Sequence, residues 1–329
     1  FWLMGEVIHG DYSRWVNGET LHSVTNYALH KALYSGHNDH NYFEIAHTVK
    51  YLQNMGNLDL YNFVDNHDVE RIYTKLSNKA HFTPVHILLY TLPGVPSIYY
   101  ASEFGIEGRK ERSSDDSLRP ALSLDDYETA LGDNPCTALI AALGQIRQHT
   151  PALSYGSYAE LHLTNRQFAF ARDLDSVRVI VTVNNDDNDA ASMDLPAGNA
   201  VEYIGALSGQ KVAVQDGRIN VTVPANSGEI WVPAGDMPEY KPFKVEISVK
   251  EETVTDEESI PADSEAPSSA TEPVHFDPNK SPENMSVAEL QAAILAKMAN
   301  NGPVSDQMKK TVTENIWHDS LVNWLKSFR

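Results

Sequence analysis

The order of hydrophobic and polar positions divides the chain into a part that alternates strands with helices and a part made of strands alone. Short apolar runs with strand character occupy residues 1–8, 23–27, 60–64 and 95–100. Helical spacing of apolar residues occupies residues 41–55, 69–76, 83–92 and 137–149. Pro93 and Pro151 end the last two of these stretches. Strands that alternate with helices predict βα units and a parallel sheet.

From about residue 154 to residue 235 the apolar runs become short and alternating. They predict strands at residues 168–172, 177–184, 200–203, 210–214, 218–223 and 228–232. Turns rich in Asn, Asp, Gly and Pro separate them. This pattern is typical of an antiparallel β-sandwich.

The tail of the chain has a different composition again. Residues 250–282 are rich in Glu, Asp, Ser and Pro without an apolar period, which predicts a disordered acidic linker over residues 236–282. Ser286 and Glu289 are spaced as a capping box for a helix, and a second helix is predicted from about Ser305 to Phe328. Two helices cannot bury a core of their own. We therefore expect residues 283–329 to associate with a protein partner, a second copy or the rest of the chain.

Composition narrows the classes of partner. The formal net charge of −20 over 329 residues argues against nucleic acid and anionic membranes, whereas a neutral substrate is compatible with it. One cysteine cannot form a disulfide within the chain, and no apolar run reaches the length of a membrane span. Phe1 already lies in a predicted strand, so we expect the chain to be the C-terminal part of a longer protein. Its compartment, cytoplasmic or secreted, stays open.

Two strand ends carry the candidate chemistry. The apolar run from Leu60 ends in Asn66, His67 and Asp68, and the run from residue 1 ends in Glu6 and His9. Polar side chains at the tip of a buried strand fit a site that binds sugar hydroxyls or a developing positive charge. The alternatives are a helix cap at Asn66–Asp68 and a solvated acid at Glu6.

In this order, the strand ends resemble the α-amylase superfamily of retaining α-glucan hydrolases and transglycosylases. Gly5-Glu6-Val7 looks like its fifth barrel strand, and Asn66–Asp68 looks like its seventh. Residues 22–27 and 92–100 look like the sixth and eighth. The resemblance implies an α/β fold in which residues 1–153 form the second half of a (β/α)8 barrel. An all-β sandwich domain (154–235), the acidic linker (236–282) and a two-helix module (283–329) would follow.

The resemblance also implies roles for these side chains. Glu6 would be the general acid and base, in a surrounding partly desolvated by apolar neighbours. Asp68 would stay ionised and bind the distorted sugar, with His67 and Asn66 as further substrate-binding residues. The nucleophilic aspartate and the calcium ligands of the family lie on earlier strands and have no counterpart here. We therefore expect no metal or cofactor in this chain, with calcium possible in a preceding part, and no activity of the chain alone.

Two further pairs have open alternatives. Asp115 and Arg119 follow the eighth strand at the spacing that related enzymes use to bind the next sugar outward, but an ordinary surface ion pair has the same spacing. His9 and Tyr12 could line the leaving-group side of the cleft, or Tyr12 could simply pack.

Other residues are interpreted as structural. Asn26 and Tyr27 are expected within the sixth strand, and Arg71 is expected to pair with a nearby acid. His37 and His40 could contribute metal ligands, but no further cluster completes a site, so we expect a polar loop. Ala101 replaces the glycine that is usual in the family after the eighth strand.

The sequence thus predicts a retaining glycoside hydrolase that acts on α-1,4-glucans such as starch, glycogen or maltodextrins, of the α-amylase or neopullulanase type. The alternative is a non-catalytic glucan-binding or scaffold protein on the same barrel. Such relatives usually lose the catalytic acids, and Glu6 and Asp68 are both present. Hydrolysis or glycosyl transfer, chain-length preference and α-1,6 tolerance stay open.

Overall fold

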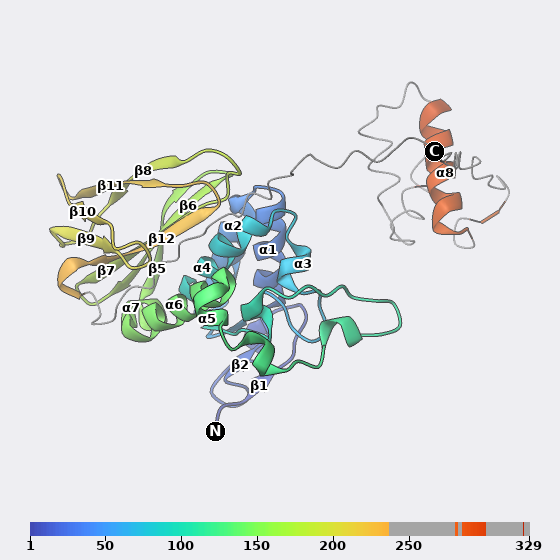
Figure 1. Ribbon diagram of the computed structural model, residues 1–329, viewed down its shortest axis with the longest axis horizontal. Helices are drawn as coiled ribbons and strands as arrows, with labels where there is room; N and C mark the ends of the chain where they lie inside the picture. The colour runs from blue at the N-terminus through green and yellow to red at the C-terminus, as the bar shows by residue number, and fades with distance from the viewer. Residues whose placement is uncertain (237–279, 282–284, 301–324, 326–329) are drawn as a thin grey trace, which may run out of the picture. The chain divides into compact units, whose positions relative to one another are not determined.

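The computed structural model describes residues 1–236, 280–281, 285–300 and 325, and the chain divides into two compact units, residues 1–251 and 252–329 (Figure 1). In the second unit, helix α8 (Val287–Asn300) begins with the predicted capping box. The main-chain N–H of Ser286 donates to the Glu289 carboxylate at 2.6 Å, and the N–H of Glu289 donates to the Ser286 hydroxyl at 3.3 Å. The predicted linker and second helix lie almost entirely outside the described residues.

The first unit begins with a parallel array of four short strands, β1 (Met4–Gly5), β2 (Ser23–Val24), β3 (Tyr61–Asn62) and β4 (Val95–Pro96). β1 pairs with β2 and β3 pairs with β4 in parallel, and a parallel bridge between Thr25 and Tyr61 joins the two pairs. The strands therefore lie side by side in chain order. Parallel strands place their carboxyl ends at one edge, so the residues that follow each strand share that edge.

Helices connect and cover these strands. They are α1 (Tyr27–Asn38), α2 (Tyr42–Gln53), α3 (Ile72–Lys75), α4 (Phe82–Thr91), α5 (Ala130–Asp133), α6 (Pro135–His149) and α7 (Pro151–Tyr155). Short 3₁₀ turns lie at Tyr12–Arg14, Lys79–His81, Ser102–Phe104, Asp116–Leu118 and Leu124–Tyr127. Pro151 occupies the first turn of α7, where its missing N–H costs nothing. Among the described residues, no helix is both long and apolar enough to cross a membrane.

Helix α1 corrects the expectation that residues 23–27 are a strand throughout. The Asn26 side chain accepts a hydrogen bond from the N–H of Leu29 at 3.1 Å and caps the helix, so Tyr27 is its first residue. The same Asn26 donates to the Asn62 side chain at 2.8 Å, and Asn62 donates to the carbonyl of Pro93 at 2.9 Å. These two buried amides connect the ends of β2, β3 and β4 where the strand ladders are short.

Residues 157–233, called the β-domain below, form two antiparallel sheets. The larger has the order β10-β9-β12-β7-β6-β5 and the smaller pairs β11 with β8. The strands are β5 (Ser157–Leu163), β6 (Gln167–Leu174), β7 (Val177–Asn184), β8 (Ala191–Pro196), β9 (Glu202–Gly205), β10 (Lys211–Ala213), β11 (Arg218–Val223) and β12 (Ser227–Pro233). Both sheets contribute to one apolar cluster that includes Met193, Tyr203, Val221 and Trp231. The sequence pattern did not indicate β5 and β8.

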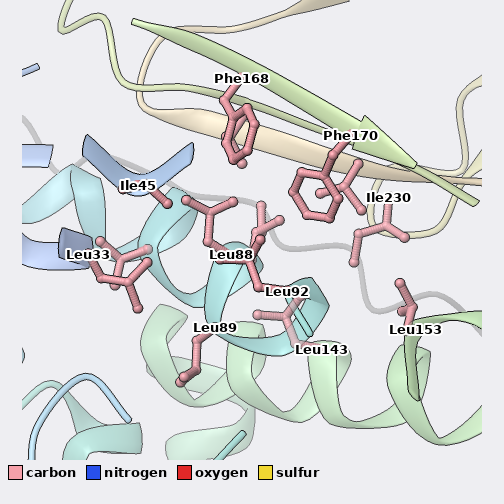
Figure 2. Close-up of a cluster of buried hydrophobic side chains, with 14 of the residues drawn as sticks. Leu33, Ile45, Leu88, Leu89, Leu92, Leu143, Leu153, Phe168, Phe170 and Ile230 are labelled. Carbon is pink, nitrogen blue, oxygen red and sulfur yellow. The ribbon is translucent and has the colours of Figure 1, made fainter. Parts of the chain in front are cut away.

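Residues 1–156, called the barrel segment below, share a core with the β-domain. Figure 2 shows Leu88 of α4 and Leu92, which directly follows that helix, between Phe168 and Phe170 of the large sheet and Leu143 of α6. All five are at most 2% exposed. Fully burying one such side chain contributes about 1.5–3 kcal/mol. This continuous core holds the helices, and through them the strand ends, against the β-domain.

Candidate active site

Glu6 follows β1 directly and lies at the carboxyl edge of the parallel strands. The Tyr27 hydroxyl donates a hydrogen bond to the Glu6 carboxylate at 3.0 Å. The Tyr27 ring packs edge-on against Phe63, with 4.9 Å between ring centroids, which fixes where the hydroxyl points. Burial raises the pKa of Tyr27, so its hydroxyl keeps its proton and remains a donor at neutral pH. Sequence reasoning missed Tyr27 as a site residue.

Asn66 links Glu6 to the second strand end. Its side-chain N–H donates to the Tyr27 hydroxyl at 3.1 Å. Its side-chain oxygen accepts the main-chain N–H groups of Asp68 at 2.8 Å and Val69 at 3.0 Å, which makes a local Asx turn. Asn66 is therefore both a turn cap, as one alternative predicted, and part of a hydrogen-bond chain from Glu6 to Asp68.

Asp68 projects from this turn and is 41% exposed. Its carboxylate contacts the guanidinium of Arg119 at 2.8 Å and Nε2 of His67 at 3.4 Å. Arg119 also donates to the carbonyl of His67 at 3.0 Å and to the carboxylate of Asp115 at 3.2 Å. Arg119 therefore joins Asp115 to the Asn66–Asp68 turn, and the two are more than an isolated surface ion pair. A hydrogen bond from Lys110 is the main cause that lowers the pKa of Asp115.

A buried polar network supports the turn from below. The Asp65 carboxylate accepts the N–H of Ile72 at 2.8 Å and the Ser102 hydroxyl at 2.7 Å. Arg71 is fully buried and donates to the carbonyl oxygens of Tyr100 at 2.6 Å and Leu118 at 2.7 Å. Burial raises the pKa of Asp65. Arg71 was expected to pair with an acid, but its hydrogen bonds go to the loops that follow β4.

The structure also places His9, Tyr12 and Glu6. His9 is exposed and makes no hydrogen bond or ion pair with the described residues. Tyr12 is 1% exposed, and its hydroxyl accepts the N–H of Ala28 at 3.3 Å, so it packs within the core. Glu6 itself is exposed, and the apolar cover expected for a desolvated acid is not present among the described residues.

The structure corrects the expectation for His37 and defines the backbone at Ala101. His37 is buried at the end of α1 with Nδ1 2.6 Å from the carbonyl of Leu33, so this stretch is not a solvated polar loop. Ala101, in the place of the usual glycine, has a left-handed backbone with φ of +69° and is 1% exposed. A residue with a side chain adopts this conformation at a cost of about 1–2 kcal/mol.

A cavity of about 680 Å³ lies away from these residues, beside the positions that precede β3 and β4. Arg147 and Arg172 line it and direct their guanidinium groups to main-chain carbonyls, including those of Gly94 at 2.7 Å and Thr91 at 2.6 Å. Gly94 has a φ of +114°, and a Cβ there would lie 2.7 Å from the Leu60 carbonyl. These contacts hold the amino ends of the strands and do not involve Glu6 or Asp68.

Residues of this chain are similar in sequence to known proteins. The family profile described as "Alpha amylase, catalytic domain" matches residues 1–156. A cyclomaltodextrin glucanotransferase of Niallia circulans is 27% identical over 180 residues, which cover 53% of this chain and 24% of that protein. A cyclomaltodextrinase of Thermoanaerobacter pseudethanolicus is 28% identical over 190 residues, covering 56% and 32%. The chain thus spans about a quarter to a third of these relatives.

A solved structure agrees with the fold. An α-amylase of Malbranchea cinnamomea superposes with a TM-score of 0.63 at 20% sequence identity, covering 72% of this chain and 52% of that one. This likeness concerns the fold, and the parallel strands with their covering helices are consistent with part of a (β/α)8 barrel. Residues 1–156 are therefore similar to the alpha-amylase catalytic domain, as the match to its family model shows.

Proposed function

We propose that this chain carries the acid/base part of the active site of a retaining glycoside hydrolase that acts on α-1,4-glucans. The observation that carries the proposal is the hydrogen-bond chain from Glu6 through Tyr27 and Asn66 to the Asp68 turn. It shows that two carboxylates more than sixty positions apart in sequence lie at one edge of the parallel strands. Both carboxylates are open to solvent, where a glucan could reach them.

In this proposal, Glu6 protonates the glycosidic oxygen as the bond to the leaving sugar breaks. As a carboxylate it then takes a proton from the attacking water or from an acceptor hydroxyl. The Tyr27 hydroxyl holds one Glu6 oxygen, which leaves the other oxygen to face the substrate. An enclosing surface would have to come with the substrate or with residues outside the described part, because Glu6 is exposed here.

Asp68 is proposed to accept hydrogen bonds from the hydroxyls of the sugar whose bond is cleaved, with His67 donating to the same sugar. Arg119 holds the Asp68 carboxylate in place and connects it to Asp115, which would contact the next sugar outward. His9 makes no hydrogen bond or ion pair with the described residues that would orient it, so its role in substrate binding rests on the family resemblance.

The retaining mechanism needs a second carboxylate about 5 Å from the acid, as nucleophile. The resemblance assigns it to the fourth barrel strand, which has no counterpart in this sequence. We therefore propose that the isolated chain is inactive and that the nucleophile comes from another half-barrel. The β-domain is proposed to shield the outer helices of the barrel, through the shared core around α4.

Calcium in the family belongs to the barrel part that this sequence lacks, and nothing in the proposed reaction requires a cofactor bound here. The names of the relatives, a cyclomaltodextrin glucanotransferase and a cyclomaltodextrinase, support a substrate built of α-linked glucose. They do not decide between water and a sugar hydroxyl as acceptor.

The first test is to read the coding sequence upstream of Phe1. We expect a strand that ends in Arg-x-Asp, and a complete upstream reading frame without one would contradict the proposed mechanism. In the protein that contains both parts, Glu6→Gln should lower maltodextrin turnover by about 10²–10⁴-fold, because the general acid is removed. Retention on immobilised maltodextrin should be unchanged.

The matched control is Glu19→Gln, which changes an exposed glutamate in the loop after β1. It should leave turnover unchanged. A wild-type protein that binds maltodextrin without turnover would instead establish the non-catalytic glucan-binding alternative. Equal turnover in Glu6→Gln and the wild type would remove Glu6 from the mechanism.

A further inference from the structure

Three side chains with metal-ligand chemistry meet far from Glu6, between the barrel segment and the β-domain. His40 follows α1, His81 ends the 3₁₀ turn Lys79–His81, and Asp187 lies in the loop after β7. Nε2 of His40 is 3.0 Å from one Asp187 carboxylate oxygen, and Nε2 of His81 is 3.3 Å from the other. The three potential ligand atoms all lie within 4.8 Å of one another.

The hydrogen bonds of His40 leave its second ring nitrogen facing the cluster. Nδ1 lies 2.7 Å from the carbonyl oxygen of Asn185, and a carbonyl can only accept, so Nδ1 carries the proton. In the neutral ring Nε2 is then a bare acceptor that faces the Asp187 carboxylate at 3.0 Å. Two acceptors at that distance repel unless a proton or a metal ion lies between them. Metal-bound histidines are commonly oriented by such a bond from the other nitrogen to a carbonyl.

His81 is the buried member of the cluster, and its side chain is 1% exposed. Its Nε2 makes a second, longer contact of 3.2 Å to the Asn185 carbonyl, which His40 already engages at 2.7 Å. Its Nδ1 is buried and has no hydrogen-bond partner among the described residues. On binding a metal through Nε2, His81 would give up this contact to Asn185, and its ring proton would lie on Nδ1.

Asp187 is held in place by the neighbouring amides. The Asn78 side chain donates to its carboxylate at 2.6 Å, and the Asn226 side chain donates to its main-chain carbonyl at 3.0 Å. His40 itself has a left-handed backbone with φ of +46°, which is uncommon for a residue with a side chain. The position of the ring toward Asp187 is therefore maintained at a conformational cost, as often occurs at functional sites.

We propose that His40, His81 and Asp187 bind a zinc-type divalent ion that joins the barrel segment to the β-domain. Two imidazoles and one carboxylate are a donor set that suits Zn²⁺, whereas Ca²⁺ and Mg²⁺ prefer oxygen alone. Asp187 is 39% exposed and His40 is 22% exposed, so water can complete the coordination from that side. Because the ligands come from both regions, the ion would stabilise their junction.

The experiment uses the full chain, purified without a histidine tag and treated with a chelator. Titration calorimetry with ZnCl₂ should give one ion per chain, and Co²⁺ in its place should give the visible absorption of a tetrahedral site. The melting temperature should rise with Zn²⁺ and saturate, because only the folded chain brings the ligands together. An equal concentration of CaCl₂ should leave it unchanged.

The variants His40→Gln and Asp187→Asn test the ligands, and both positions are partly exposed, so the variants should fold. Each should weaken Zn²⁺ binding by at least about tenfold, and Asn78→Ala should weaken it less. His47→Gln, an exposed histidine on α2, is the control and should bind Zn²⁺ as the wild type does. No binding by the wild type, or equal binding by all variants, would overturn the proposal.

Discussion

The barrel segment and the β-domain hold their shapes by different means. In the β-domain, β6 and β7 pair over eight residues each, and apolar side chains are buried on both faces of the sheet. In the barrel segment, each parallel strand is only two residues long. The strand ends there are connected by side chains: Asn26 to Asn62, Tyr27 to Glu6 and Ser102 to Asp65.

This difference decides what a substitution can do. A strand ladder uses main-chain groups that every residue except proline supplies, so its geometry depends little on identity. A side-chain network depends on each partner, and losing one partner leaves a buried polar group unpaired. We therefore expect changes in the β-domain to act through stability alone. Changes at the strand ends should act on the geometry of the site as well.

The largest effect is expected in the β-domain core. Phe170→Ala removes a ring with 0% exposure between the large sheet and α4, and it should lower the free energy of unfolding by about 3–5 kcal/mol. Urea denaturation followed by circular dichroism measures this. Val201→Ala, at a position 83% exposed, is the control and should change stability by less than about 0.5 kcal/mol. Similar losses in both variants would mean that the shared core does not hold the two regions together.

The next effect concerns the buried network under the site. Arg71→Met keeps an unbranched chain but removes the donors to the Tyr100 and Leu118 carbonyls, and it should cost about 3 kcal/mol. It should also lower the affinity for maltodextrin, because the loops that hold Arg119 would move. Arg112→Met changes an exposed arginine of the same region and should do neither. A loss of stability without any loss of affinity would show that the buried network of Arg71 does not determine the geometry of the site.

Low pH should lower the stability of the chain through histidines that are buried in the barrel segment. Among the described residues, the buried histidines are His30, His37, His81 and His86, all before residue 157. Burial, with a smaller contribution from Lys75, lowers the pKa of His30 to about 3, and burial lowers that of His86 to about 4. The folded chain therefore binds fewer protons than the unfolded chain between these values and about pH 6.5. Their contribution to stability is complete above pH 6.5 and decreases as the pH falls toward 3–4.

The expected loss between pH 7 and pH 5 is about 2 kcal/mol for each of these two histidines. Urea denaturation at a series of pH values should show it. His86→Met removes one group and should make the pH dependence correspondingly shallower. His162→Gln, in the β-domain, is the control and should leave the slope as it is. A slope unaffected by His86→Met would mean that this histidine is not kept neutral by burial.

Periodicity predicted the four strands of the barrel segment and the helices α2, α3, α4 and α6, because their apolar residues recur at strand or helix spacing. It missed α1 because this helix buries histidines and a glycine along with Leu29 and Leu33, so its inner face does not read as apolar. It missed β8 because Ser192 and Asp194 alternate with only two large apolar residues. Both elements can be recognised only from the residues that they pack against in the folded chain.

The residues of the candidate site likewise divide into those that the sequence predicts and those that only the folded chain brings together. Glu6 and Asp68 could be found because each directly follows an apolar run. Tyr27 could not, because its role depends on the strand order that places β2 between β1 and β3. The cluster of His40, His81 and Asp187 has no sequence signature, because its members come from three separate loops. Contacts of this kind are a property of the packed chain, whereas strand-end acids are visible in one stretch.

The smallest effect on stability is expected at Tyr27, where the effect on stability and the effect on turnover should differ most. Tyr27→Phe keeps the ring against Phe63 and removes only the hydroxyl between Glu6 and Asn66, so unfolding should become easier by only about 1 kcal/mol. In the active protein, turnover should fall by about tenfold or more, because Glu6 loses the bond that positions it. Binding of maltodextrin should be nearly unchanged.

Tyr51→Phe, an exposed tyrosine on α2, is the control for both measurements. Full turnover in Tyr27→Phe would show that the hydrogen-bond chain orders the strand ends without positioning the acid.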